Sequence, residues 1–159
     1  MASDYLLELD GVKGESKDDV HKETIEIASW SLGASNPTNV GSSGLSAGKV
    51  SYSDLSVMIS LEKASVDLLT KVSTGKVIPK AILYGRKGGD DKRQDYLKVT
   101  LSEVMVSSWQ TSASDGSGIP MLSVSFAFSK IEFIYKPQNE DQTLGDDMIA
   151  TYDLKALKK

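Results

Sequence analysis

Cysteine is absent from this 159-residue sequence, and His21 is its single histidine. Without cysteine the chain has no disulfide, no cysteine-ligated zinc site and no thiol catalysis. One histidine cannot supply the ligand cluster of a typical zinc site, so His21 is interpreted as a solvated surface residue, and we expect no metal or cofactor. No window approaches about 18 apolar residues, so no membrane-spanning helix is expected.

A strong excess of one charge is also absent. The sequence has 18 Lys and Arg against 22 Asp and Glu, a formal net charge of −4, so nothing indicates binding to nucleic acid or to an anionic membrane. Arg86, Lys87, Lys92 and Arg93 flank a turn expected at 88–91 and are interpreted as solubilising, with an interface patch as the alternative. Residues 1–30 lack a basic start followed by an apolar run, so we expect no cleavable signal peptide. Residues 1–159 are expected to form one domain.

Two long segments, 94–109 and 121–137, show the period-two alternation of β-strands. Both exceed the usual strand length of about 5–6 residues. In the first segment the apolar side chains move from odd positions, ending at Leu101, to even positions, starting at Val104. In the second they move from even positions to odd ones at Ile131. Such a slip turns the apolar side to the other face of the strand. We therefore expect bulges or bends at matching heights, or halves that bury opposite faces.

The remaining pattern is also mostly β. Further strands are expected over 5–9, 24–32, 50–61, 80–87 and 148–154. The second and third of these carry phase slips of the same kind. Only 62–74 predicts a helix, which Gly75 would end in the left-handed region. Long antiparallel strands leave exposed edges unless the sheet closes or pairs with a neighbour. We therefore predict a mainly β fold, an antiparallel β-barrel of about seven to nine strands with one short α-helix.

The longest irregular stretch is expected at 33–49, which is rich in glycine and serine. Loops longer than about 12–15 residues are usually functional or disordered. Residues 44–48 match the Gly-x-Ser-x-Gly pattern of hydrolase nucleophile elbows around Ser46. That chemistry needs a strand before the serine and a helix after it, and the pattern predicts neither. We expect no catalytic residue, and a hydrolase that uses Ser46 stays only as an alternative.

Several stretches taken in order cover nearly the whole chain: 9–18, 30–31, 48–50, 54–56, 73–76, 96–101, 104–108 and 133–138. Together they resemble the haemolysin-coregulated protein (Hcp) family. The resemblance implies the inner tube of the bacterial type VI secretion system, similar to the tail tube of contractile phages. Family members form homohexameric rings that stack into a tube, and a contracting sheath drives the tube, with its spike, out of the cell.

The resemblance also implies that the lumen carries or protects effector proteins, and that the protein is structural rather than an enzyme. Some members carry a toxin domain after the tube domain, which we do not expect here because the chain ends soon after its last predicted strand. The protein would lie in the bacterial cytoplasm before firing and then be secreted without a signal peptide. A monomeric β-barrel that binds a small ligand in its mouth is the alternative.

Two sets of residues are candidates for assembly. Ser29 and Ser31 lie opposite the apolar side of a strand that the family places at the channel wall, so they are lumen-facing candidates. Ordinary solvent-facing strand residues would show the same pattern. The resemblance further implies that the long loop reaches an adjacent subunit or ring. Its candidate contact residues are Asn36, Pro37, Gly44, Leu45 and Gly48.

Overall fold

The structure is a computed structural model that describes residues 4–41, 43–87, 94–116, 118–141 and 143–158. The turn expected at 88–91 lies outside these ranges. The first strands are β1 (Tyr5–Leu9), β2 (Ile25–Glu26), β3 (Ser29–Ser31), β4 (Ala34–Ser35), β5 (Thr38–Gly41), β6 (Gly44–Ala47) and β7 (Ser51–Tyr52). They are followed by β8 (Leu55–Ser60), helix α1 (Lys63–Thr74), β9 (Ile78–Lys87), β10 (Gln94–Ser112), β11 (Met121–Ala127), β12 (Lys130–Tyr135) and β13 (Met148–Asp153).

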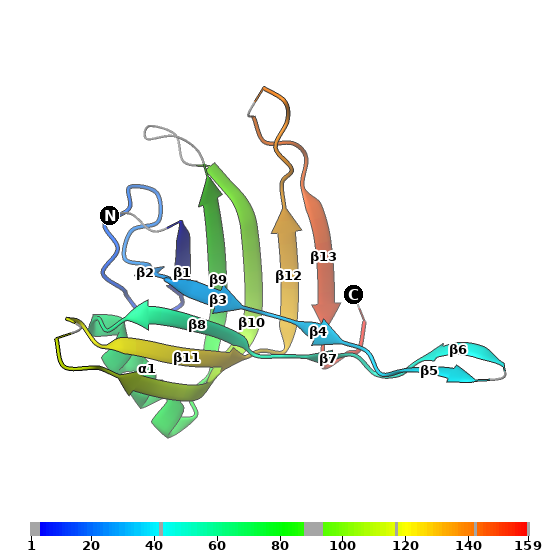
Figure 1. The fold of residues 1–159 in the computed structure, drawn as a ribbon, viewed down its shortest axis with the longest axis horizontal. Helices are drawn as coiled ribbons and strands as arrows, with labels where there is room; N and C mark the ends of the chain where they lie inside the picture. Colours follow the sequence, from blue (N-terminus) through cyan, green and yellow to red (C-terminus); the bar gives the residue numbers. More distant parts are fainter. Residues whose placement is uncertain (1–3, 42, 88–93, 117, 142, 159) are drawn as a thin grey trace.

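Nine strands form one sharply bent antiparallel sheet. The hydrogen-bonded order is β2-β1-β9-β10-β11-β8-β3, and β12 and β13 extend it from β10. Figure 1 shows two halves: an upright half of β1, β9, β12, β13 and the start of β10, and a transverse half of β3, β8, β11 and the end of β10. We call them the β9 half and the β8 half. The 19-residue strand β10 runs through both.

The phase slip in β10 marks the point where this strand passes from one half to the other. Between the buried residues Leu101 and Val104, Glu103 adopts a φ of 52°, a left-handed conformation uncommon for a residue other than glycine. Up to Ser102 the strand pairs with β12, and from Met105 it pairs with β11. The chain therefore reverses its buried side where it changes sheet partners.

The second long segment bends at the same height. It divides into β11 and β12, and the break between them is held against the bend of β10. There the Ser129 N–H donates to the Ser102 carbonyl at 3.1 Å. The Ser129 hydroxyl donates to Glu103 Oε2 at 2.9 Å. The prediction of bends at matching heights is confirmed.

The segment 24–32 makes the third crossing, and it corrects one detail of the predicted barrel. The Ile27 N–H donates to the Tyr5 carbonyl at 3.0 Å, whereas the Ala28 N–H donates to the Met58 carbonyl at 2.8 Å. The mainly antiparallel β fold is confirmed, but hydrogen bonding does not close the barrel, because β2 and β3 are the two ends of an open strand order. They are parts of one bent segment, so Ile27 and Ala28 join them covalently.

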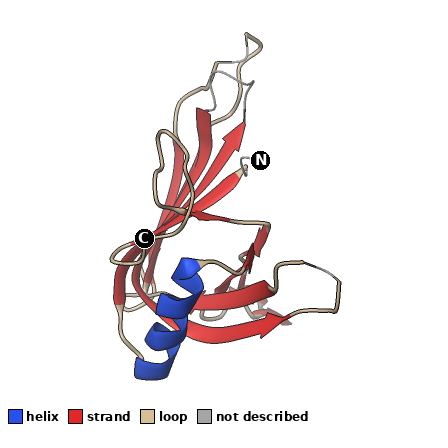
Figure 2. Ribbon diagram, turned by 90° about the vertical axis from the view of Figure 1, so that its left-hand side faces the viewer, coloured by secondary structure: helices blue, strands red, loops and turns tan. Residues whose placement is uncertain are grey.

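The core lies between the two halves and beneath the helix (Figure 2). At α1 the Glu62 N–H donates to Ser65 Oγ at 3.0 Å, and Gly75 ends the helix with a φ of 68°, as predicted. The indole N–H of Trp109 donates to the Ser65 carbonyl at 3.0 Å and ties the helix to β10. The largest fully buried side chains are those of Phe126, Leu6, Leu7, Ile25, Leu55, Ile59 and Leu68.

The stretch 33–49 is not irregular, contrary to the sequence prediction. The strand β4 pairs with β7, and β5 pairs with β6, so residues 33–41 and 43–53 form a narrow two-stranded ribbon that projects from the body (Figure 1). We call this ribbon the arm. Its strands β5 and β6 are exposed at every position. Backbone pairing and a few side-chain hydrogen bonds build most of the arm, so an apolar pattern could not reveal it.

Candidate assembly surfaces

The outer face of the β8 half carries rows of uncharged side chains, most of them serine. One row crosses β3, β8, β11 and β10 and is entirely serine: Ser31, Ser56, Ser125 and Ser108. The next row is Ser29, Met58, Ser123 and Gln110, and a third is Ser60, Met121 and Ser112. Directly opposed residues share one face of a sheet. We call this surface the serine face; none of its positions is charged, although 25% of the chain is.

The two lumen-facing candidates are both on this surface. Ser29 and Ser31 are exposed on β3. The structure adds neighbours that the sequence analysis missed, among them Ser56 and Ser125, whose hydroxyls lie 3.0 Å apart. The alternation of serine along β11 was a signal for them, but only the strand register shows that the serines form continuous rows.

The reverse side of the same strands is a rigid apolar support. Trp30, Val57, Val124 and Trp109 lie opposite one another across the four strands. The two valines are at most 2% exposed, and both tryptophans pack against the core. The ring of Trp30 also meets that of Tyr5 edge-on at 6.0 Å, which connects the β8 half to the β9 half. The tryptophans therefore act as core anchors, and the serine face is fixed in position.

The β8 half also has strand edges that are open within the described residues. The strand β3 pairs only with β8. On its β9 side, β10 has no strand partner after Val104. Such edges present unpaired backbone groups to any chain that approaches them.

The loop candidates separate into two groups on the arm. Asn36, Pro37 and Gly48 lie together at its neck, where the Gly48 N–H donates to both of the others. Gly44 and Leu45 lie near the tip. There Leu45 is opposite Val40, and these two side chains are 79% and 82% exposed. The tip is thus an exposed apolar pair without a partner in the described chain.

The structure does not support a nucleophile elbow at Ser46. This serine lies in the exposed strand β6 opposite Asn39, and the chain continues into β7 rather than into a helix. No group of three or more histidine, aspartate or glutamate residues in the described ranges could hold a metal ion. Within those ranges no helix is long and apolar enough to cross a bilayer.

His21 and Arg86 are not solvated surface residues, contrary to the sequence interpretation. The His21 side chain is 11% exposed, its Nε2 lies 2.8 Å from Asp95 Oδ2, and its ring stacks on Tyr84 at 3.8 Å. The Arg86 side chain is 5% exposed and forms ion pairs with Asp18 and Asp95. The cause is the segment 10–24, which folds over β9 and covers groups that sequence alone places beside a turn.

This cluster shifts the ionisation of its members. Burial alone would raise the pKa of Asp18, but hydrogen bonds from the His21 backbone and Arg86, with the positive charge of Arg86, hold it below the usual value. Burial, followed by the negative charges of Glu8 and Asp95, raises the pKa of Tyr84 to about 12. We call Asp18, His21, Arg86 and Asp95 the ion clamp, because they fasten the segment 10–24 to β9 and β10.

The filled interior does not favour a small-ligand barrel. A binding site of that kind needs an open apolar cavity. Phe126 is instead completely buried, and Phe128 and Phe133 pack against the core around it. A sheet face without charged positions, open strand edges and a projecting arm are features of a structural subunit that assembles with other copies.

Comparison with known proteins gives the family. Residues 6–135 match the family described as "Type VI secretion system effector, Hcp". The chain is 38% identical over 142 residues to Protein hcp1 of Pseudomonas aeruginosa, and the match covers 89% of this chain and 88% of that protein. The chain therefore belongs to the Hcp family and is a structural subunit of a type VI secretion tube, as the resemblance implied.

Solved structures agree over the full length. A structure described as that of a type six secretion system protein matches with a TM-score of 0.91 and 32% identity, and covers 99% of both chains. Hcp1 from Salmonella typhimurium matches with a TM-score of 0.81 and 34% identity over the same shares. Likeness at this level includes the arm as well as both halves of the sheet.

Proposed function

We propose that residues 1–159 are one tube domain, that the subunit forms a homohexameric ring lined by its serine face, and that effector proteins are held in the lumen. The observation that carries this proposal is the set of uncharged rows across four strands. Fixed charges in a narrow channel would attract some cargoes and repel others. Serine hydroxyls can donate or accept hydrogen bonds, so the surface suits cargoes of different sequence. Ser29 and Ser31 then face the lumen.

The open edges support ring closure. When β3 of one subunit lies beside the end of β10 of the next, the β8 half continues from subunit to subunit. This is a heterologous contact, and it closes into a ring when the rotation between neighbours divides the circle evenly. Closure would also remove the edges that are open in the isolated subunit.

The arm supports stacking of rings. It extends in the direction of the β8-half strands, beyond the body of the subunit (Figure 1). Its tip candidates Gly44 and Leu45 would contact a subunit of the adjacent ring, and its neck candidates Asn36, Pro37 and Gly48 would hold the tip in place for that contact. Sheath and spike proteins of the machine would then meet the outside and the end of the tube. In this proposal the subunit lies in the cytoplasm before firing and needs no signal peptide, cofactor, nucleic acid or membrane partner.

The absence of cysteine makes the lumen directly testable. In Ser31→Cys the new thiol should react fully with a small maleimide in the assembled ring, but only in part with a maleimide on a large polymer. Thr70→Cys is the matched control, because Thr70 is exposed on α1 and should react fully with both reagents. Native mass spectrometry should show a hexamer. A stable monomer at tens of micromolar, or equal labelling of both variants by the large reagent, contradicts the proposal.

A further inference from the structure

The arm is bound to itself at its root. The Ser53 N–H donates to the Gly33 carbonyl at 2.8 Å, and the Gly33 N–H donates to Ser53 Oγ at 2.8 Å. The next two rungs are Ala34 opposite Tyr52 and Ser35 opposite Ser51. Up to this height the arm is a regular two-stranded ribbon.

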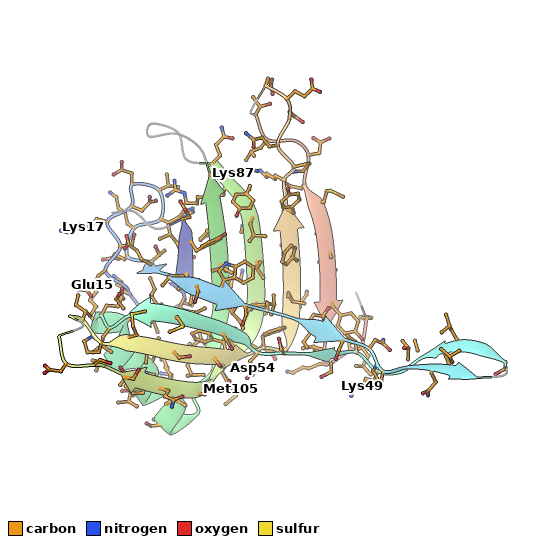
Figure 3. The ribbon with its side chains drawn as sticks, viewed as in Figure 1. Glu15, Lys17, Lys49, Asp54, Lys87 and Met105 are labelled. Atoms are coloured by element: carbon orange, nitrogen blue, oxygen red, sulfur yellow. The ribbon has the colours of Figure 1, made fainter. Side chains whose placement is uncertain are left out.

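Its neck is irregular. Beyond the rung between Ser35 and Ser51, one strand continues through Asn36 alone while the other continues through Lys49 and Val50 (Lys49 is labelled in Figure 3). Unequal strand lengths of this kind bend a ribbon. Asn36 precedes a proline, which favours an extended backbone, and the proline has no N–H to offer the ladder.

A single N–H holds this bend together. The Gly48 N–H donates to the Pro37 carbonyl at 2.8 Å and to Asn36 Oδ1 at 2.9 Å. The contact is so close that a Cβ atom on Gly48 would lie 2.8 Å from that carbonyl oxygen and 2.7 Å from the proline ring. The Asn36 side chain therefore gives the Gly48 N–H a second acceptor beside the Pro37 carbonyl, at the point where the two strands become unequal.

We propose that Asn36 is a positioning residue that sets the direction of the arm tip and thereby controls ring stacking. This inference rests on the proposed function, in which the tip contacts a second copy of the chain. Four residues per strand lie beyond the neck, a lever of about 13 Å at about 3.3 Å per residue. A small rotation at the neck therefore displaces Val40 and Leu45 widely. A fixed direction also lowers the ordering cost of docking.

The decisive pair of variants is Asn36→Leu, which removes the acceptor at nearly constant size, and Asn36→Asp, which keeps an acceptor oxygen. The protein concentration needed for tube growth, measured by sedimentation, should rise about threefold with leucine. This is less than the worth of one full net hydrogen bond, because the Pro37 carbonyl still accepts from the Gly48 N–H. With aspartate it should stay within about twofold. Ring formation, measured by native mass spectrometry, should be unchanged in both variants.

A distance measurement separates tip direction from stability. Because the chain has no cysteine, spin labels can be attached at Ser43→Cys near the tip and Lys98→Cys on β10. With one labelled subunit per ring, the distance between the two labels reports the position of the tip relative to β10. We expect a narrow distance distribution for wild type and Asn36→Asp and a broader one for Asn36→Leu.

The outcomes are distinguishable. Wild-type rings that never stack overturn the proposed function and this inference together. If wild type stacks and Asn36→Leu stacks equally well, only the role of Asn36 is overturned, and an unbroadened distance distribution in that variant overturns it as well.

Discussion

The serine face and the ion clamp use charge in opposite ways. The serine face is a broad exposed surface without a charged side chain, whereas the ion clamp gathers a buried guanidinium, two partly exposed carboxylates and an imidazole at the edge of the β9 half. Surfaces usually carry the charges and interiors usually exclude them. In the proposed ring the serine face would meet the cargo, whereas the ion clamp fixes the segment 10–24 within the subunit.

The largest effect is expected when the clamp loses its central cation. Arg86→Met should lower the free energy of unfolding by about 3–5 kcal/mol, because Asp18 and Asp95 would be left as negative charges without that partner. Urea unfolding at fixed protein concentration measures the loss. Lys98→Met, an exposed site on the same sheet, is the control and should change stability by less than about 0.5 kcal/mol. Similar losses in both variants would show that the buried pairing contributes nothing special.

The second-largest effect is expected for Asp18, whose contribution to stability depends on pH. The folded-state pKa of Asp18 lies below its ordinary value of 3.8, so its ionised form stabilises the fold above that value. This stabilisation is lost as the pH falls through the folded-state pKa. Asp18→Asn should cost about 2 kcal/mol near pH 7, the worth of a charged hydrogen bond. The cost should shrink below about pH 4. A difference from wild type that stays constant between pH 7 and pH 3 would contradict the assignment.

The bends of the long strands could be predicted from the sequence, whereas the ion clamp could not. Each slip in apolar phase, such as that between Leu101 and Val104, can be read from neighbouring residues alone. Each marks a place where the chain bends and changes its strand partners. The clamp joins Asp18 and His21 to partners that lie more than 60 positions away in the chain, and only the folding of 10–24 over β9 brings them together. The local sequence pattern therefore predicted that His21 and Arg86 are solvated.

The assembly surfaces show the same division. Ser29 and Ser31 were assigned to the lumen from alternation and from resemblance, and that role is still a prediction. The rows to which they belong depend on cross-strand register, which no single strand encodes. The arm was mistaken for irregular chain because its pairs, apart from Val40 and Leu45, are small or polar. Hydrogen bonds of Asn36, Gly48 and Ser53 hold it, and Tyr52 at its root packs against the core.

A charge placed on the serine face tests whether the absence of charge there matters for the function rather than for the stability of the subunit. Ser108 is exposed on β10. The substitution Ser108→Glu should therefore change the free energy of unfolding by no more than about 0.5 kcal/mol. In a ring it would add one negative charge per subunit to the lumen, so binding of acidic effectors should weaken while the hexamer persists. The measurements are urea unfolding, native mass spectrometry and co-purification of a defined effector. A loss of stability like that of Arg86→Met would place Ser108 in a packed interface instead.

The smallest effect on the subunit is expected at the arm tip, and the effect on assembly should be the most selective. Leu45→Asp replaces a side chain that is 79% exposed, so the unfolding free energy should stay within about 0.5 kcal/mol of wild type. Tube growth should nevertheless be impaired more than ring formation, because a charge at the tip must be desolvated when rings stack. Val66→Asp, on the exposed side of α1, adds the same charge away from the arm. Rings that fall apart in Leu45→Asp, with stacking of the survivors unchanged, would place the tip between neighbours in one ring, and the apolar pair would then belong to ring closure.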